Sequence, residues 1–428
     1  MLRIELGHVM VAEECEMKKA HLANVFVVVF IDLLGFGLIL PLLPFYAETF
    51  GGSPIVIGLL LTSYSAAQFV GAPVLGRLSD KYGRRPILLV SVFGTFVGYL
   101  VLALANGLWM LFASRIIDGI TGGNISVAQS YITDVTDEKN RAKGLGVIGA
   151  AFGFGFILGP AIGGVLSTFG FAVPAIAAAA LAFLNMICIT FWLPESLTDA
   201  TRAELAKHPR RSFAADALMQ ALRRPQVGAL LQTRFFYGVA FVSFESSFAL
   251  LTQFRLGLTP QIAGATVGLV LAYVGVLAAL VQGVAVGRLA VRYGEKRLIF
   301  VFMILLSISL GSWAFVPNLL LLLVVLIPLS FSVGIINTSI NSALTKSVGR
   351  EEIGETLGLN ASLESLTRVL APTTSLLLFE GVGPYAPGVF GALLTSWLVL
   401  YLWRRSSWNA VPSPVSTALT ENHLETIP

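Results

Sequence analysis

The stretch "GRLSDKYGRRP", Gly76 to Pro86, places five charged residues among eleven positions. The preceding "GLLLTSYSAAQFVGAPVL" (residues 58–75) and the following "ILLVSVFGTFVGYLVLALA" (residues 87–105) contain no charged residue. About 20 predominantly apolar residues cross the hydrocarbon core of a bilayer as one helix. The pattern therefore predicts two membrane helices joined by a short charged segment.

The composition extends this prediction to the whole chain. Of 428 residues, 56% are hydrophobic and 12% are charged, and the mean hydropathy is +0.82. A water-soluble core cannot bury that much apolar surface. We expect an all-α integral membrane protein with twelve transmembrane helices, over residues 22–46, 54–76, 86–105, 108–134, 144–168, 171–193, 227–253, 262–287, 298–316, 318–346, 353–379 and 385–403.

The Lys and Arg residues predict the topology, because cytoplasmic loops collect positive charge. If both termini are cytoplasmic, 24 of the 28 lie on the cytoplasmic side. Only Arg255 lies outside, and Arg115, Arg234 and Arg368 lie within apolar spans. The net charge of +4 therefore indicates topology and no nucleic-acid partner. We expect a multi-pass protein of the cell membrane, in contact with the lipid bilayer and with both termini cytoplasmic.

Cysteine and histidine usage supports neither a disulfide framework nor a metal site. The two cysteines, Cys15 and Cys188, lie at opposite ends of the first half of the chain, so a disulfide framework is unsupported. The four histidines all lie outside the predicted spans. We therefore expect no metal site.

The chain contains an internal repeat. "GRLAVRYGEKRL", Gly287 to Leu298, repeats the opening stretch 211 positions later, and Pro372 follows Pro160 by 212 positions. Internal duplication with a site between the two halves is typical of secondary transporters. The expected segments are an N-terminal cytoplasmic segment, two six-helix bundles, the linker between them and a cytoplasmic tail, at residues 1–21, 22–193, 194–226, 227–403 and 404–428.

Several motifs carry a family resemblance. They are "GRLSDKYGRR" from Gly76, "RIIDGITGGN" from Arg115, "GFILGPAIGG" from Gly155 and "DLLGFGLILPLLP" from Asp32. With these motifs the chain resembles major facilitator superfamily transporters, within the twelve-helix drug:proton antiporter branch that includes the tetracycline exporters. The resemblance implies two six-helix bundles, a monomer, a small-molecule substrate, and coupling to protons, with the proton gradient as the energy source and no cofactor.

The chain also departs from the tetracycline exporters. Those transporters carry an additional acid in helix 3, where this chain reads "FVGYLV" around Gly98, and another in helix 9, where it reads "MILLSIS" near Leu306. The second copy of the charged motif has Val291 where the first has Asp80. These departures argue against a metal–tetracycline complex as the substrate.

The charged motif is a candidate cytoplasmic gate. The resemblance implies that Asp80 faces the positive N-terminal end of helix 11, and that Arg84 reaches an acid at the end of helix 4, here Asp134. The alternative is that the basic residues only determine topology. That role requires neither Asp80 nor the glycines. The candidate gate residues are Gly76, Asp80, Gly83, Arg84, Arg85 and Asp134.

Charges inside the bilayer are costly and are functional candidates by default. The spacings predict that Arg115 pairs with Asp118 and Glu364 with Arg368, each pair on one helical face. Arg234 and Glu245 lie on one helix but about 16 Å apart along it, and Asp32 has no partner within its own helix. Burial raises the pKa of a carboxyl group, so that it can exchange a proton near neutral pH. Our order of proton-carrier candidates is Asp32, Glu245 and Glu364, and a structural role for Asp32 is the alternative.

Helices 4 and 5 supply the remaining candidates. A polar stripe runs along helix 4, either lining a central cavity or packing against helix 2, and consists of Arg115, Asp118, Gly122, Ser126, Gln129 and Thr133. The candidates for lining the cavity or contacting the substrate are three residues of this stripe and two arginines of other helices: Arg115, Asp118, Gln129, Arg234 and Arg368. The antiporter motif of helix 5 combines small residues for close packing with a kinking proline, at Gly155, Gly159, Pro160, Gly163 and Gly164.

Three functions remain open at this point. We favour a proton-coupled exporter of amphipathic small molecules or drugs that works by alternating access. A proton symporter or uniporter of a metabolite is the first alternative. A polytopic enzyme or receptor is a remote one, because we find no nucleophile–base or metal constellation of the kind that catalysis requires. We therefore predict that the chain is not an enzyme.

Overall fold

The computed structural model describes residues 22–137, 140–198, 201–202, 215–282, 286–349 and 352–405. Within these ranges the secondary structure is helical and contains no strand. The predicted N-terminal segment 1–21, most of the tail 404–428 and much of the linker 194–226 lie outside the described residues. The linker does contain a short amphipathic helix, α10 (Ala215–Arg223).

The first half begins with a helix at Leu22–Ile39. It continues through α2 (Leu43–Thr49), α3 (Pro54–Tyr82), α4 (Arg84–Ala103), α5 (Leu108–Thr121), α6 (Asn124–Val135), α7 (Arg141–Ser167) and α8 (Ala172–Trp192). The second half contains α11 (Pro225–Leu256), α12 (Pro260–Leu280), α13 (Val286–Tyr293), α14 (Glu295–Ala314), α15 (Leu319–Lys346), α16 (Ile353–Gly381) and α17 (Ala386–Arg404).

Two predicted spans are broken, so their prediction as continuous helices was wrong. The span 108–134 divides into α5 and α6 at Gly122–Gly123, because two adjacent glycines weaken a helix. The span 22–46 divides near Pro41, which lacks a backbone N–H and crowds the carbonyl of the preceding turn. The charged motif itself is mostly helical, because α3 continues to Tyr82 and only Gly83 separates it from α4.

Among the described residues, ten helices are long and apolar enough to cross a membrane. The other two crossings are the α5–α6 pair, whose members are individually short, and α16, which carries several charged residues along its length. The fold therefore has twelve membrane crossings, six in each half.

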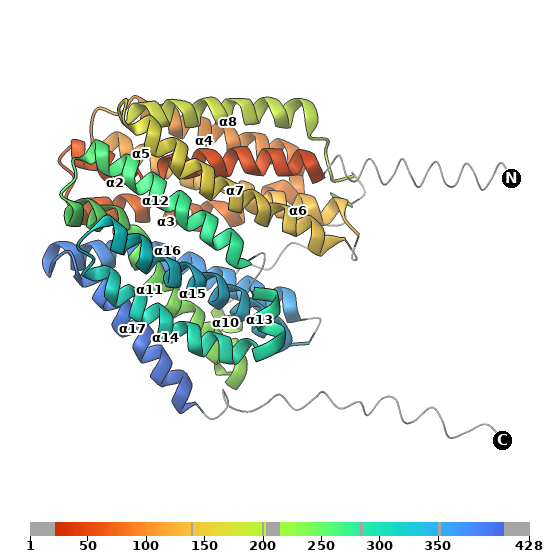
Figure 1. The fold of residues 1–428 in the computed structure, drawn as a ribbon. Coiled ribbons are helices and arrows are strands. Elements are labelled where there is room, and N and C mark those ends of the chain that lie inside the picture. The colour runs from red at the N-terminus through yellow and green to blue at the C-terminus, as the bar shows by residue number, and fades with distance from the viewer. Residues whose placement is uncertain are drawn as a thin grey trace, which may run out of the picture.

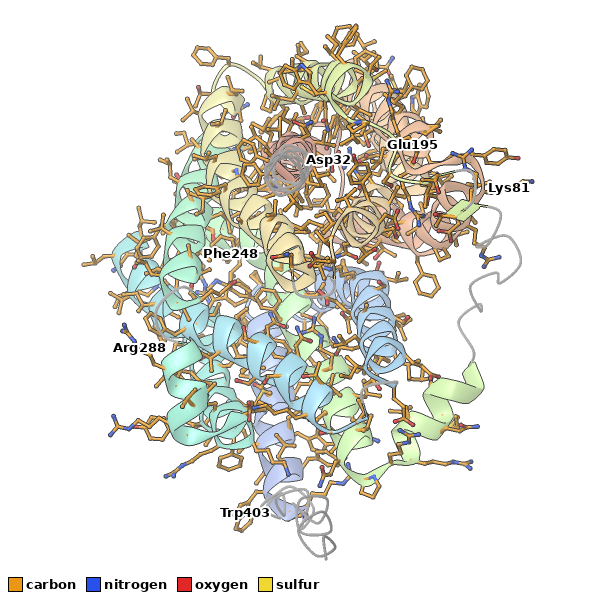
Figure 2. All side chains as sticks on the ribbon, turned by 90° about the vertical axis from the view of Figure 1, so that its right-hand side faces the viewer. Asp32, Lys81, Glu195, Phe248, Arg288 and Trp403 are labelled. Carbon is orange, nitrogen blue, oxygen red and sulfur yellow. The ribbon has the colours of Figure 1, made fainter. Side chains whose placement is uncertain are left out.

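Figure 1 shows most of the red-to-yellow helices of the first half above the green-to-blue helices of the second half. We call the end of the bundle that carries Arg77, Arg84, Arg288 and Lys346 the basic face. Figure 2 looks onto this face and shows Asp32 within the upper bundle, whereas Lys81 and Arg288 point outward.

Contacts between the halves join α3 to α16 and α7 to α12. Hydrogen bonds join Ile55 and Thr62 of α3 to α16 of the other half, far from the basic face. Glu48 of α2 and Gln253 of α11 are a further hydrogen-bonding pair between the halves. On α7, Gly164 packs closely against α12, whereas a Cβ added to Gly149, nearer the basic face, would have no neighbouring atom within 4 Å. The halves are therefore joined at the face opposite the basic face.

Candidate transport and gating site

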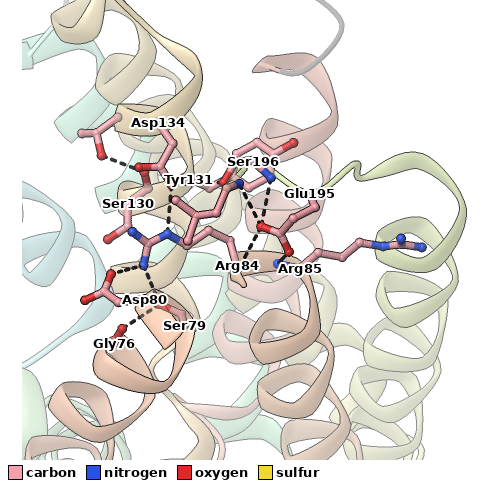
Figure 3. Close-up of polar contacts among 12 residues, drawn as sticks. Gly76, Ser79, Asp80, Arg84, Arg85, Ser130, Tyr131, Asp134, Glu195 and Ser196 are labelled. Carbon is pink, nitrogen blue, oxygen red and sulfur yellow. Dashed lines mark hydrogen bonds and ion pairs between the residues drawn. The ribbon is translucent and has the colours of Figure 1, made fainter. Parts of the chain in front are cut away.

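The basic-face end of the first half holds a cluster of charged side chains around Arg84 (Figure 3). The guanidinium of Arg84 donates to Asp80 Oδ1 at 2.5 Å, Asp134 Oδ2 at 2.9 Å and Ser79 Oγ at 2.7 Å. The Arg84 side chain is only 1% exposed. One buried cation therefore joins the end of α3 to the end of α6, with Arg84 contacting Asp134 as the resemblance implies.

Glu195 completes this cluster and was missed by the sequence analysis. Its carboxylate accepts hydrogen bonds from the backbone N–H groups of Arg84 at 2.9 Å and Arg85 at 3.2 Å, so it caps the N-terminus of α4. A helix N-terminus leaves unpaired N–H groups that favour an acid. The sequence signal was weak, because Glu195 lies 111 positions from Arg84 in the joint after α8.

Gly83 makes this capping possible. Its φ is +108°, a conformation that other residues rarely adopt. A Cβ on Gly83 would also fall against the Glu195 carboxylate. The other motif residues contribute locally: Arg85 donates to the carbonyl oxygen of Thr190, and the carbonyl oxygen of Gly76 accepts from Ser79 Oγ at 2.8 Å.

Inside the first half, Arg115 and Asp118 form a buried pair. Arg115 Nη1 lies 3.2 Å from Asp118 Oδ2, and both side chains are less than 5% exposed. The Arg115 guanidinium also lies 5.7 Å from the ring centroids of Tyr64 and Tyr99, within the range of cation–π attraction. This charge pair is enclosed by the first bundle.

Asp32 has different surroundings. It lines a small cavity with Asn124 and Asn185, and Asn124 is its hydrogen-bonding neighbour. Another acid, Asp118, lies close enough to repel its charge. Among the residues that the structure describes, no Lys or Arg forms an ion pair with Asp32.

The second half carries a chain of four charged residues between α11 and α16. Arg234 contacts Glu364, Glu364 lies 3.7 Å from Arg368, and Arg368 lies 3.4 Å from Glu245. Arg234 also donates to Asn337 on α15. Arg234 and Glu245 of α11 are too far apart to pair with each other, and each pairs with a residue of α16.

The break between α5 and α6 divides the predicted polar stripe. Gly122 accepts a hydrogen bond from Gln68 of α3 at 2.8 Å, so this part packs against helix 2. Ser126 and Thr133 donate to backbone carbonyls of their own helix segment, and Gln129 is exposed. The stripe is therefore interrupted at Gly122–Gly123.

The antiporter motif lies where two helices meet α7. Gly155 packs on Leu33, Gly159 on Gly37 and Gly163 on Leu38, all on the first helix. On another side of α7, Gly164 approaches Gly268 of α12 so closely that a Cβ added to Gly164 would lie 3.1 Å from the Gly268 Cα. Pro160 packs against Gly268 as well. A side chain in place of these glycines would force the helices apart.

The repeat extends to the charged cluster, with opposite signs. Glu295 stands 211 positions after Arg84, and Lys346 stands 212 positions after Asp134. Lys346 Nζ contacts Glu295 Oε1, and Ser342 Oγ donates to the same oxygen at 2.9 Å. The second half therefore repeats the ion pair with the acid and base exchanged.

Comparison with known sequences decides the family, since residues 25–372 match the sequence model of the Major Facilitator Superfamily. The chain belongs to this superfamily. A curated member of similar sequence is the class C tetracycline resistance protein of Escherichia coli, 32% identical over 404 residues, which cover 90% of this chain and 96% of that protein.

Two solved superfamily structures resemble the fold. The human organic anion transporter MFSD10 is 25% identical with a TM-score of 0.67, over 90% of this chain and 99% of that chain. The nucleoside transporter NupG has a TM-score of 0.72 at 14% identity, over 89% of this chain and 97% of that chain, and shows the fold alone. The superfamily relatives are therefore membrane transporters and drug-resistance proteins.

Proposed function

We propose that the chain is a proton-coupled exporter of amphipathic small molecules that works by alternating access. The observation that carries the proposal is the difference between Asp32 and the other embedded acids. Asp118, Glu245 and Glu364 each pair with an arginine, whereas no cation of the described chain pairs with Asp32. A carboxyl group without a fixed cation can gain and lose a proton without breaking an ion pair.

The orientation belongs to this proposal. The basic face is cytoplasmic in this proposal, because positive charge collects on that side, and we assign both termini to the cytoplasm as well. The halves are joined at the opposite face, so the structure corresponds to a state open toward the cytoplasm. The protein acts in the cell membrane as a monomer, with a small-molecule substrate and protons as its partners, and it is a transporter and no enzyme.

The substrate differs from a metal–tetracycline complex in this proposal. Tetracycline exporters carry an acid in helix 3 where this chain has Gly98. A Cβ on Gly98 would lie 3.1 Å from the Cβ of Asp118, so an acidic side chain would be forced against Asp118. Two acids in contact in a buried site repel each other. The site as built around Gly98 is therefore unsuited to the additional acid of the tetracycline exporters.

A growth-inhibition panel in an efflux-deficient bacterial host tests the function. Cells expressing the chain should survive higher concentrations of at least one class of amphipathic drug than cells with an empty vector. Cells expressing Asp32→Asn at equal membrane abundance should resemble the empty vector. Equal sensitivity of all three strains across cationic, anionic and neutral compounds would contradict drug export.

A further inference from the structure

Helices α3 and α16 run antiparallel, and each has an acid in its last turn. Asp80 lies near the C-terminus of α3, and Glu380 lies near the C-terminus of α16. A helix C-terminus carries partial negative charge, which disfavours an acid there. Each acid is offset only if it meets positive charge from elsewhere.

Glu380 meets that charge at the N-terminus of α3. Its Oε2 accepts a hydrogen bond from the backbone N–H of Ile55 at 2.9 Å. Pro54 has no N–H, and the Ser53 side chain does not cap the helix. Ile55 therefore offers the first free donor of α3, and its cap comes from the other half of the molecule.

Two further contacts accompany this cap. Thr62 Oγ1 donates to the Val369 carbonyl at 3.1 Å and lies 2.8 Å from Thr373 Oγ1. Between them, Gly58 allows close approach, since its virtual Cβ would lie 3.0 Å from the Pro372 carbonyl oxygen. All of these contacts must break if α3 and α16 separate at this face.

We infer that Glu380 is an extracellular gate residue, which stabilises the state closed to the outside by capping α3 from the opposite half. It is a positioning residue and touches no substrate. Asp80 and Glu380 then act at opposite ends of one helix pair. In this state Glu380 caps α3, while Asp80 pairs with Arg84 inside its own half. This inference rests on the alternating-access mechanism proposed above.

The expected effect follows from the exposure of the contact. An acid at an exposed helix N-terminus contributes about 0.3–1 kcal/mol, which corresponds to about a two- to fivefold change in a conformational equilibrium. Glu380→Gln removes the charge at nearly constant shape. The open state at the outer face should therefore become about two- to fivefold more populated.

The test uses cysteine accessibility. Leu376 is fully buried and packs against Gly58, so Leu376→Cys reports opening of this contact in a Cys15→Ser, Cys188→Ser background. A membrane-impermeant maleimide is added to the outside of cells or right-side-out vesicles, without drug or proton gradient. Glu380→Gln should raise the labelling rate about two- to fivefold. Gly381→Ala is the matched control, because it adjoins Glu380 and has open space.

A second variant tests the same contact in case Glu380→Gln does not fold. Gly58→Val should wedge the same contact open and also raise the rate. A parental rate for Glu380→Gln or for Gly58→Val, in protein that inserts normally, would overturn the inference, as would an equal increase in Gly381→Ala. The result is independent of drug export, because labelling requires no transport. If the chain exported no drug, the proposed function would be contradicted, but the labelling rates could still be measured and compared.

Discussion

The two halves of this duplicated chain use charge in different ways. In the first half, Arg84 is buried among Asp80, Asp134 and the cap formed by Glu195. In the second half the position of Arg84 is taken by Glu295, whose partner Lys346 is 67% exposed, and Val291 stands where the first half has Asp80. The duplicated position has kept an ion pair, but only the first half has built a buried, multiply bonded cluster around it.

Inside the membrane it is the second half that has the more extensive network of ion pairs. The second half neutralises its embedded charges in one chain from Arg234 to Glu245. The first half pairs Arg115 with Asp118 and leaves Asp32 without a cation among the described residues. We infer that the first half carries both the firmer gate and the freer acid. Variants matched between the halves can test each part of this comparison.

The largest expected effect is loss of proton coupling in Asp32→Asn. The amide retains size and hydrogen bonding but cannot alternate between neutral and charged forms. In reconstituted vesicles this variant should lose uphill accumulation driven by a pH gradient and retain downhill exchange. Glu245→Gln is the matched change in the second half and should retain coupling. Full uphill transport by Asp32→Asn, with loss in Glu245→Gln, would move the proton carrier to the second half.

The next effect concerns stability at the basic face. Arg84→Met leaves Asp80 and Asp134 without their shared cation, and removing one partner of a buried pair costs about 3–5 kcal/mol. Lys346→Met removes a cation that is 67% exposed, and ion pairs with a solvent-exposed cation typically contribute about 0–1 kcal/mol. Denaturant unfolding of the two purified variants measures the difference. Equal losses would show that the two clusters are energetically alike, despite their different burial.

Hydropathy and spacing predicted part of this site, and the reasons are local. The twelve crossings follow from apolar length, and the Arg115–Asp118 and Glu364–Arg368 pairs follow from helical spacings of three and four. The Arg234–Glu364 contact joins residues 130 positions apart, so it depends on how α11 and α16 rotate against each other. No local pattern encodes that rotation.

The breaks and the cap were missed for a related reason. Gly122–Gly123 lies within an apolar run that is long enough to cross the membrane, and hydropathy is insensitive to helix continuity. Glu195 acts through two backbone N–H groups, and a sequence motif does not display backbone donors. In both cases the decisive property is backbone geometry.

The glycines that follow α3 and α13 inside the two charged motifs allow a smaller comparison. Gly83 and Gly294 both have positive φ, at +108° and +75°, and placing another residue in such a conformation costs about 1–3 kcal/mol. Gly83→Ala also forces a methyl group against Glu195, whereas the space around Gly294 is open. We expect Gly83→Ala to lower the unfolding free energy more than Gly294→Ala. The reverse order would contradict the close packing of Glu195 on Gly83.

The smallest expected effect is a pH dependence where the end of the linker meets the second half. Arg224 and Glu352 form an exposed pair at 2.6 Å, and hydrogen bonds from Arg224 hold the pKa of Glu352 below its ordinary value. An acid with a lowered pKa in the folded state adds stability above its unfolded pKa, about 4.3 for Glu, and loses it as the pH falls through the folded value. The stability difference between the unmodified chain and Arg224→Met should therefore be present at neutral pH and shrink under acidic conditions. Melting temperatures in detergent at several pH values measure this difference, with Arg223→Met as the neighbouring control. A difference that stays constant down to acidic pH would mean that Arg224 stabilises the fold only through the packing of its alkyl chain. Its charge would then contribute nothing to stability, in contrast to the buried charge of Arg84.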